Sequence, residues 1–340
     1  MQETRTHMAT IKDIADEVGI SKAAVSRILN NKGSFSAETT EKVWRVAKRL
    51  NYLPSGGQHA DDADDIKVLA AIFPQEGLLL NESPYYSIMI SLLEKAAYDY
   101  GYSLMLCGAL YNWEDEEKIF RSLRQRNVRG VILGSFSHDA AIFHNQRIPV
   151  VTIGTKASDQ IPCIRSDNYA SGQAAARHLL GKGCRRPLYI TGYWRGLEYD
   201  ERYRGFADEL ARHEVTPKAY HLGMNATRLQ DIEGIITRMA LDNPDADALF
   251  AESYSLSLEC LRTYIGLGWR IPQDLKMVGY GNAFLTAYSN PRITLVKEDS
   301  WQIARRAVSL LVDLIENGPS AEASARDILV PVSLEAHQTT

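Results

Sequence analysis

From residue 66 onward, short apolar runs alternate with amphipathic stretches of helical length, and this alternation limits the possible folds more than any other feature. The apolar runs with strand character are 66–73, 102–107, 130–134 and 149–154. Strands that alternate with helices form βαβ units, which pair into a parallel sheet with helices on its faces. We therefore predict an α/β domain in this part of the chain.

A second series of the same kind follows. Its predicted strands are 187–192, 246–251 and 275–280, and its predicted helices are 169–180, 198–213 and 255–267. Two series predict two doubly wound parallel sheets, one in each of two subdomains. Ligands of such sheets bind beyond the carboxyl ends of the strands, so we expect a small-molecule site between the two facing subdomains.

The first fifty residues predict three short helices. Thr10 and Asp13 have the spacing of a capping box, and Gly19 is suited to end the first helix with a positive φ. Ser21 and Ser36 offer N-cap hydroxyls for two further helices. A connection of about three residues between the first two helices is typical of a helix-turn-helix, which sets its second helix into the major groove of DNA.

The N-terminal part of that second helix would contact bases. Lys22, Ala23 and Arg27 would then face bases, and the Arg27 guanidinium is suited to a bidentate contact with guanine. Hydroxyl and amide side chains suited to phosphate oxygens are Ser21, Ser26, Asn30, Ser34 and Thr39. The alternative is a three-helix bundle whose polar face is only solvated.

Charge and composition agree with this organisation. Residues 1–59 hold nine Lys/Arg and six Asp/Glu, whereas the remainder holds 29 and 36, so a basic segment precedes an acidic one. The four cysteines form no C-x-x-C pair and are interpreted as free thiols. No apolar run is long enough for a membrane span, and the polar N-terminus lacks the features of a secretory signal, so we expect a cytoplasmic protein.

Enzymatic signatures are absent from the sequence. The patterns G-x-S-x-G, G-x-x-x-x-G-K-[ST] and H-E-x-x-H do not occur, and the eight histidines lack ligand spacing. We therefore expect no catalysis, no cofactor and no metal. The rival classes are a transport-type binding module, which would carry a signal peptide, and a sugar-processing enzyme, which would show paired carboxylates or a nucleophile.

Several segments of the sequence resemble those of the LacI/GalR family of transcription regulators. The stretch ATIKDIADEVGISKAAVSRILNNKGSFSAETTEKVWRVAKRLNYLPS resembles the family's DNA-binding headpiece, and ERYRGF, LGWRIPQDLKMVGYGN and LVPVSLEAHQTT extend the resemblance to the end of the chain. The resemblance implies a core like periplasmic sugar-binding proteins, and a homodimer that binds a palindromic operator. It also implies an allosteric repressor of sugar utilisation genes, released by a galactoside or an oligosaccharide. A regulator that needs a nucleobase or phosphorylated metabolite as corepressor is the alternative.

The resemblance also sets the expected domain boundaries. They are 8–54 for the helix-turn-helix, 55–65 for a linker, 66–340 for the effector-binding and dimerisation domain, 66–158 with 296–318 for its N-terminal subdomain, and 164–291 with 326–340 for its C-terminal subdomain. In the linker, where the family has a hinge helix, this chain has two glycines and four aspartates and no leucine. Glycine destabilises a helix and aspartate repels phosphate, so we expect a flexible tether there.

Effector contacts are implied only where motifs match. Arg202 of ERYRGF matches the family arginine that binds sugar hydroxyls or an acidic effector, since a guanidinium fork suits either. Tyr85 and Tyr86 occupy a position where aromatic rings stack on sugar faces. Gly281 replaces a common family aspartate, so the remaining candidates are Asn282, Glu252, Trp194 and Glu298. The alternative for each is core packing or solvated surface.

Overall fold

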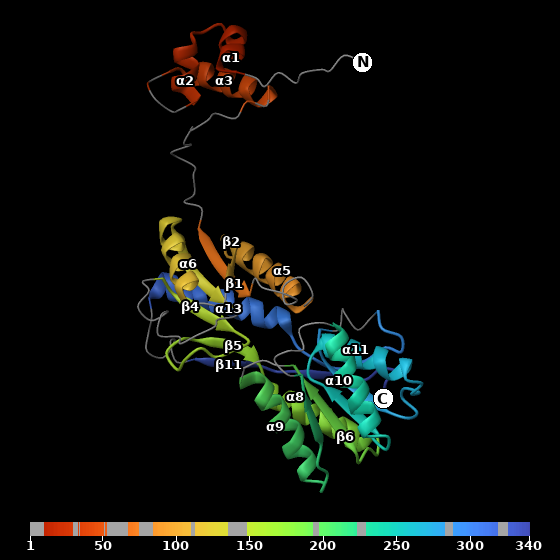
Figure 1. Cartoon of the computed structure of the whole chain (residues 1–340). Coiled ribbons are helices and arrows are strands. Elements are labelled where there is room, and N and C mark those ends of the chain that lie inside the picture. The colour runs from red at the N-terminus through yellow and green to blue at the C-terminus, as the bar shows by residue number, and fades with distance from the viewer. Residues whose placement is uncertain are drawn as a thin grey trace, which may run out of the picture. The chain divides into compact units, whose positions relative to one another are not determined.

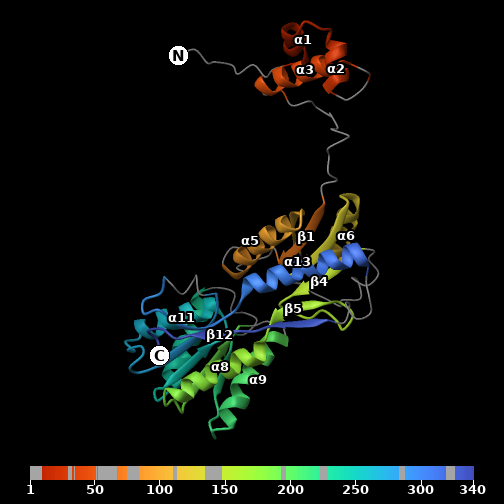
Figure 2. The same cartoon turned by 180° about the vertical axis from the view of Figure 1, so that it is seen from behind.

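The chain divides into two compact units, residues 1–66 and 67–340, and each is described by itself. The computed structural model describes residues 10–29, 33, 35–50, 52, 67–74, 84–109, 113–134, 148–192, 197–222, 229–282, 288–318 and 326–340 (Figures 1 and 2). The predicted linker at 55–65 lies outside these residues. Within them, no helix is both long and apolar enough to cross a membrane.

The first unit contains the three predicted helices, α1 (Ile11–Val18), α2 (Lys22–Leu29) and α3 (Ala37–Arg49). The Thr10 and Asp13 capping box is present, and Gly19 ends α1 at a φ of 80°. Ser36 accepts a hydrogen bond from the Thr39 amide at the start of α3. One small core holds the helices together, made of Ile14, Ala15, Val18, Val25, Ile28, Leu29, Val43, Val46 and Ala47. The predicted caps and turn are therefore confirmed.

The second unit begins with a six-stranded sheet in which all strands are parallel, in the order β11-β5-β4-β3-β1-β2. Its elements are β1 (Val68–Pro74), α5 (Pro84–Asp99), β2 (Ser103–Ala109), α6 (Trp113–Gln125), β3 (Val128–Leu133), β4 (Val150–Ile153), β5 (Cys163–Ser166), α13 (Ser300–Asn317) and β11 (Asp327–Val330). Helices α5 and α13 lie side by side on one face, as Figure 2 shows, and share a buried apolar core with the strands.

The second sheet repeats this arrangement in the order β12-β10-β9-β8-β6-β7, with only the β10 and β12 pair antiparallel. Its elements are α8 (Asn168–Gly181), β6 (Pro187–Thr191), α9 (Leu197–Ala211), β7 (Lys218–His221), α10 (Leu229–Asp242), β8 (Ala248–Ala251), α11 (Tyr254–Gly266), β9 (Lys276–Gly281), β10 (Thr294–Lys297) and β12 (Ser333–Glu335). The prediction of two doubly wound sheets is confirmed. In both sheets the strand order reverses beside the first strand, where ligands of this fold bind.

The chain crosses between the subdomains three times, and the crossings differ from the expected boundaries. They fall between β5 and α8, between β10 and α13, and between β11 and β12. The expectation placed 164–291 and 326–340 in the second subdomain, but β5 and β11 pair with each other in the first sheet. The sequence analysis did not identify β5 and β11 as strands, because a four-residue strand has too few side chains to show an alternation of apolar and polar residues.

Helices α8 and α9 approach each other closely at two glycines. A Cβ added at Gly172 would lie 2.1 Å from the Arg202 carbonyl oxygen, and one at Gly205 would lie 2.0 Å from the Tyr169 carbonyl oxygen. Only glycine permits this backbone-to-backbone contact. As a result, the first turn of α8 lies beside the part of α9 that carries Arg202.

Candidate functional site

The exposed face of α2 is the candidate DNA-binding surface. The three residues predicted to contact bases, Lys22, Ala23 and Arg27, are exposed, whereas Val25 and Ile28 on the opposite face are buried. The helical period produces this separation, because residues three and four apart share a face. All three side chains are therefore accessible to solvent on the surface of this unit.

Three of the predicted phosphate contacts lie among the described residues: Ser21 precedes α2, Ser26 lies within α2 and Thr39 lies in the first turn of α3. The Ser21 hydroxyl accepts a hydrogen bond from the Ala24 amide at 3.1 Å, which caps α2 and leaves the hydroxyl proton to donate. The Thr39 hydroxyl oxygen lies 2.7 Å from the Ser36 hydroxyl oxygen. The Ser26 side chain is half-buried. Asn30 and Ser34 lie outside the described residues.

Replacing Arg27 by Ala is expected to weaken operator binding by about 1–3 kcal/mol and to relax the preference at one base pair of each half-site. The exposed side chain makes it the residue of α2 best suited to a bidentate base contact. Fluorescence anisotropy with operators varied one base pair at a time measures both effects. An equal loss on every sequence would show a phosphate contact instead.

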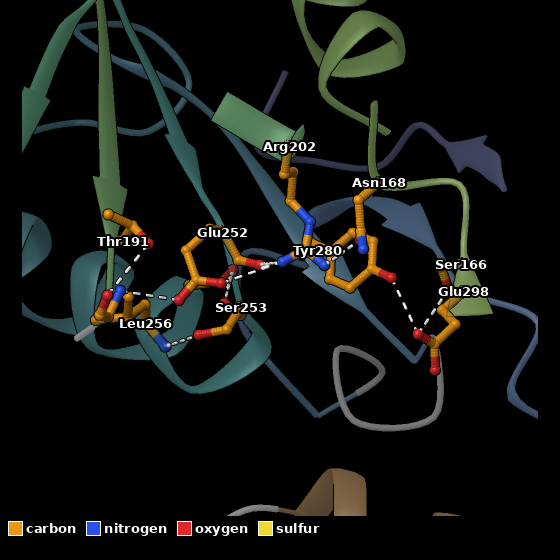
Figure 3. Close-up of polar contacts among 11 residues, drawn as sticks. Ser166, Asn168, Thr191, Arg202, Glu252, Ser253, Leu256, Tyr280 and Glu298 are labelled. Carbon is orange, nitrogen blue, oxygen red and sulfur yellow. Dashed lines mark hydrogen bonds and ion pairs between the residues drawn. The ribbon is translucent and has the colours of Figure 1, made fainter. Parts of the chain in front are cut away.

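The candidate effector site is a buried polar cluster at the carboxyl ends of strands in the second sheet (Figure 3). Arg202 on α9 is 5% exposed and lies at its centre. Its Nη1 donates to the Glu252 backbone oxygen and, at 3.1 Å, to the Glu252 carboxylate, while Nη2 donates to the Asn168 side-chain oxygen at 2.6 Å. The guanidinium carbon lies 3.5 Å from the centre of the Tyr280 ring. Arg202 therefore contacts three other residues of the cluster.

Glu252 follows β8 directly and is 1% exposed. One carboxylate oxygen faces Arg202, and the other accepts a hydrogen bond from the Gly192 amide at 2.9 Å. Gly192 follows β6, the strand beside β8, so the carboxylate joins two neighbouring strand ends to α9. A charge buried this deeply requires such compensation.

Glu298 links the cluster to the first subdomain. Its carboxylate accepts hydrogen bonds from the hydroxyls of Tyr280 at 3.0 Å, Ser166 at 2.7 Å and Ser300 at 2.9 Å. Burial raises the pKa of Tyr280, and the Glu298 carboxylate raises it further, so the phenol keeps its proton and donates it. Ser166 ends β5 of the first sheet, whereas Glu298 follows β10 of the second. The hydrogen bond therefore joins two of the three crossings.

A second ion cluster lies next to the first. Arg165 of β5 donates to both carboxylate oxygens of Asp327 in β11, at 3.0 and 2.9 Å, and also pairs with Glu201, the neighbour of Arg202 on α9. Burial disfavours its charge, but the hydrogen bonds to Asp327 and Glu201 outweigh burial and raise the pKa of Arg165. Arg165 remains charged and connects the first sheet to α9.

The other predicted effector residues lie at different places. Tyr85 and Tyr86 begin α5, with ring centres 5.3 Å apart, and Tyr86 packs edge-on against the buried Phe73. The Tyr85 hydroxyl is directed toward Gly154, 3.8 Å from where a Cβ would lie. Asn282 follows β9 and is half-buried. Trp194 lies outside the described residues.

Sequence reasoning missed several members of these clusters, namely Asn168, Tyr280, Ser166, Ser300, Arg165, Glu201 and Asp327. Tyr280 stands in the string GYGN beside Asn282, so its place at a strand end was visible in the sequence. The contribution of Asn168 depends on the close contact of α8 with α9, which no local pattern reveals. Among the described residues, no group of His, Cys, Asp and Glu is arranged to hold a metal ion.

Two protein families match separate parts of the chain. Residues 10–55 match the family described as bacterial regulatory proteins, lacI family. Residues 176–340 match the family described as periplasmic binding protein-like domain. The two matches fall on the two units of the structure.

Known proteins resemble the chain over most of its length. A ribose operon repressor from Halalkalibacterium halodurans is 28% identical over 98% of this chain and 97% of its own length. The HTH-type transcriptional repressor PurR from Edwardsiella ictaluri is 26% identical over 91% of each chain. The crystal structure of the lac repressor dimer bound to operator and the anti-inducer ONPF has 21% identity and a TM-score of 0.75, covering 98% of this chain and 99% of that one. This last likeness is one of fold.

Proposed function

Because this chain is a DNA-binding repressor of the lacI family, we propose that it represses genes of sugar utilisation and is released from its operator by a small sugar. The observation that carries the proposal is the polar cluster around Arg202, at the strand ends where ligands of doubly wound sheets bind. In this proposal the protein binds its effector without converting it.

The choice of a sugar rests on the chemistry of the cluster and on the similar ribose operon repressor. Carboxylates, amides and guanidinium groups provide the hydrogen-bonding atoms that hydroxyl groups need, and aromatic rings stack on apolar sugar faces. Glu252, Asn168 and Arg202 supply the hydrogen-bonding atoms. Tyr85 supplies an aromatic ring from the first subdomain. A galactoside or an oligosaccharide is our first candidate.

The repressor is proposed to act as a homodimer on a palindromic operator. Large apolar side chains are exposed in both subdomains, among them Tyr98, Leu106, Leu241, Ile265 and Leu267. Exposed apolar side chains mark a surface that another protein covers where they form one contiguous patch, and we propose that a second copy of the chain covers such a patch. A second copy related by two-fold symmetry would present two headpieces to two half-sites.

Effector binding is coupled to DNA binding through the relative position of the two subdomains. The hydrogen bond from Ser166 to Glu298 and the pair between Arg165 and Glu201 both span them, beside Arg202. An effector that contacts both subdomains stabilises one arrangement of these contacts and so shifts the population toward it. Coupling of this kind is typically about 1–3 kcal/mol, or 5- to 150-fold in affinity.

Operator release by a sugar is the expected result of the direct test. An operator is first selected from random DNA with the full chain, and its affinity is then measured by anisotropy with each member of a panel of pentoses, galactosides and oligosaccharides. One sugar is expected to lower operator affinity by about 5- to 150-fold, in line with a typical coupling energy. A sugar that instead raises the affinity would contradict the proposed sign.

A nucleobase corepressor is the second candidate function, favoured by the similarity to the repressor PurR. The same assay distinguishes it, because hypoxanthine or guanine would then tighten operator binding while every sugar is inert. That result would replace the sugar proposal and leave the DNA-binding function unchanged.

A further inference from the structure

We infer that Glu252 determines the charge of the effector: by neutralising Arg202, it restricts the site to effectors without a negative charge and excludes phosphorylated and carboxylated compounds. The inference rests on the proposed function, because it concerns the ligand of the same cluster. The sequence allows Arg202 to bind either the hydroxyl groups of an effector or an anionic group, and the inference favours the hydroxyl groups.

The first argument is the state of the guanidinium. An arginine that binds an anionic ligand needs donors directed at the ligand and a positive charge that no protein carboxylate cancels. Nη1 of Arg202 is directed at Glu252 and Nη2 at Asn168, and the Tyr280 ring covers one face of the guanidinium. An incoming phosphate would have to displace Glu252.

Displacement of Glu252 is costly because of its burial. The Glu252 side chain is 2% exposed, and its carboxylate contacts both the guanidinium and the Gly192 amide. A carboxylate separated from its cation inside a protein keeps its desolvation penalty without the compensating attraction. An anionic effector would therefore have to bind beside an unpaired buried negative charge.

The second argument is the balance of charge around the site. Among the residues that the structure describes, the cluster contains one cation, Arg202, and two carboxylates, Glu252 and Glu298. The hydrogen bonds described for Glu298 come from hydroxyl groups and not from cations. The neighbouring Arg165 faces two carboxylates of its own, so it offers an anion no net attraction. Like charges at a binding site disfavour the wrong partner.

A hydroxylated neutral ligand meets none of these obstacles. Carboxylate oxygens accept from hydroxyl groups while they still pair with a guanidinium, because each oxygen has more than one acceptor position. The ion pair between Arg202 and Glu252 is then kept, and the pair as a whole orients the ligand.

The test uses inorganic phosphate as the probe of Arg202. Thermal unfolding of the full chain is followed in sodium phosphate and in sodium chloride of equal ionic strength, for wild type, Glu252→Gln, Arg202→Gln and the control Glu201→Gln. Glu201→Gln is the control because it also removes one negative charge, at the residue directly before Arg202. Arg165, the partner of Glu201, keeps its bidentate contact with Asp327 in this variant. Headpiece sites for phosphate affect all four proteins equally.

We expect phosphate to raise the unfolding temperature of Glu252→Gln by about 2–4 °C more than chloride does, in excess of any phosphate effect on wild type or Glu201→Gln. A folded Glu252→Gln protein without this gain would overturn the inference. A phosphate effect on wild type that disappears in Arg202→Gln would overturn it as well, and this comparison does not depend on the folding of Glu252→Gln.

Operator release separates this inference from the proposed function. Each sugar of the panel is compared with its phosphate ester, for example ribose with ribose 5-phosphate. A phosphate ester that releases the operator at a lower concentration than its parent sugar would refute the charge restriction while leaving a sugar-responsive repressor. If no sugar releases the operator, the sugar proposal fails, and the phosphate experiment still decides the role of Glu252.

Discussion

Replacing Arg202 by Ala is expected to lower the free energy of unfolding of the 67–340 unit by about 3–5 kcal/mol and to abolish the response to effector. The large cost follows from burial, since the change leaves the Glu252 carboxylate without its cation and removes the group stacked on Tyr280. Urea unfolding measures the first effect, and the effector dose response of operator binding measures the second. Operator affinity itself is expected to change little, because α2 belongs to the other unit.

Two variants control this result. Arg204→Ala removes an exposed arginine from the same helix and is expected to change stability by no more than about 0.5 kcal/mol. The double variant Arg202→Ala with Glu252→Gln removes the unpaired charge and is expected to recover part of the lost stability. If Arg202→Ala left both the unfolding curve and the dose response unchanged, Arg202 would belong neither to the buried network nor to the site.

Replacing Gly205 by Ala is expected to destabilise the same unit by about 3 kcal/mol, although alanine is the better helix former. The added Cβ would lie 2.0 Å from the Tyr169 carbonyl oxygen and 2.8 Å from its carbonyl carbon, both of them backbone atoms of α8. The helices must therefore separate, and the contact of Arg202 with Asn168 is lost with them. Thermal unfolding measures the stability, and effector affinity is expected to fall in parallel.

Gly234→Ala is the matched control for this change. Gly234 lies in α10, and an added Cβ would meet no atom within 4 Å. Without a clash, the lower conformational entropy of alanine in the unfolded chain is expected to stabilise the protein by about 0.5–1 kcal/mol. Opposite signs for the two substitutions would show that the helix contact matters, whereas equal signs would contradict it.

The parts of the fold that depend on local patterns were predictable from the sequence. The caps at Thr10 and Ser36 and the turn at Gly19 use short-range hydrogen bonds and backbone preferences, and the structure contains all three. The long apolar strands were recognisable because each buries most of its residues. Local physics therefore located both sheets and the headpiece.

The parts that depend on distant segments were not predictable in this way. The pairing of β5 with β11 joins residues more than 160 positions apart, and neither four-residue strand has a distinctive period. Arg202 was identified as a site residue from its motif, but its pairing with Glu252 follows from how α9 lies over β8, which the motif does not specify. The role of Gly172 likewise appears only once α8 and α9 are placed together.

The pairing of β5 with β11 also bears on how the protein is made. A nascent chain emerges from the ribosome in sequence order, so β5 is synthesised about 160 residues before the strand that covers its edge. Helix α13, which completes the core of the first subdomain, also arrives after the whole second sheet except β12. Contacts between segments so far apart form slowly, and unpaired strand edges promote aggregation. The subdomain that begins first therefore stays incomplete until almost the whole chain has been made, and the β5 edge that β11 later covers stays unpaired for that time.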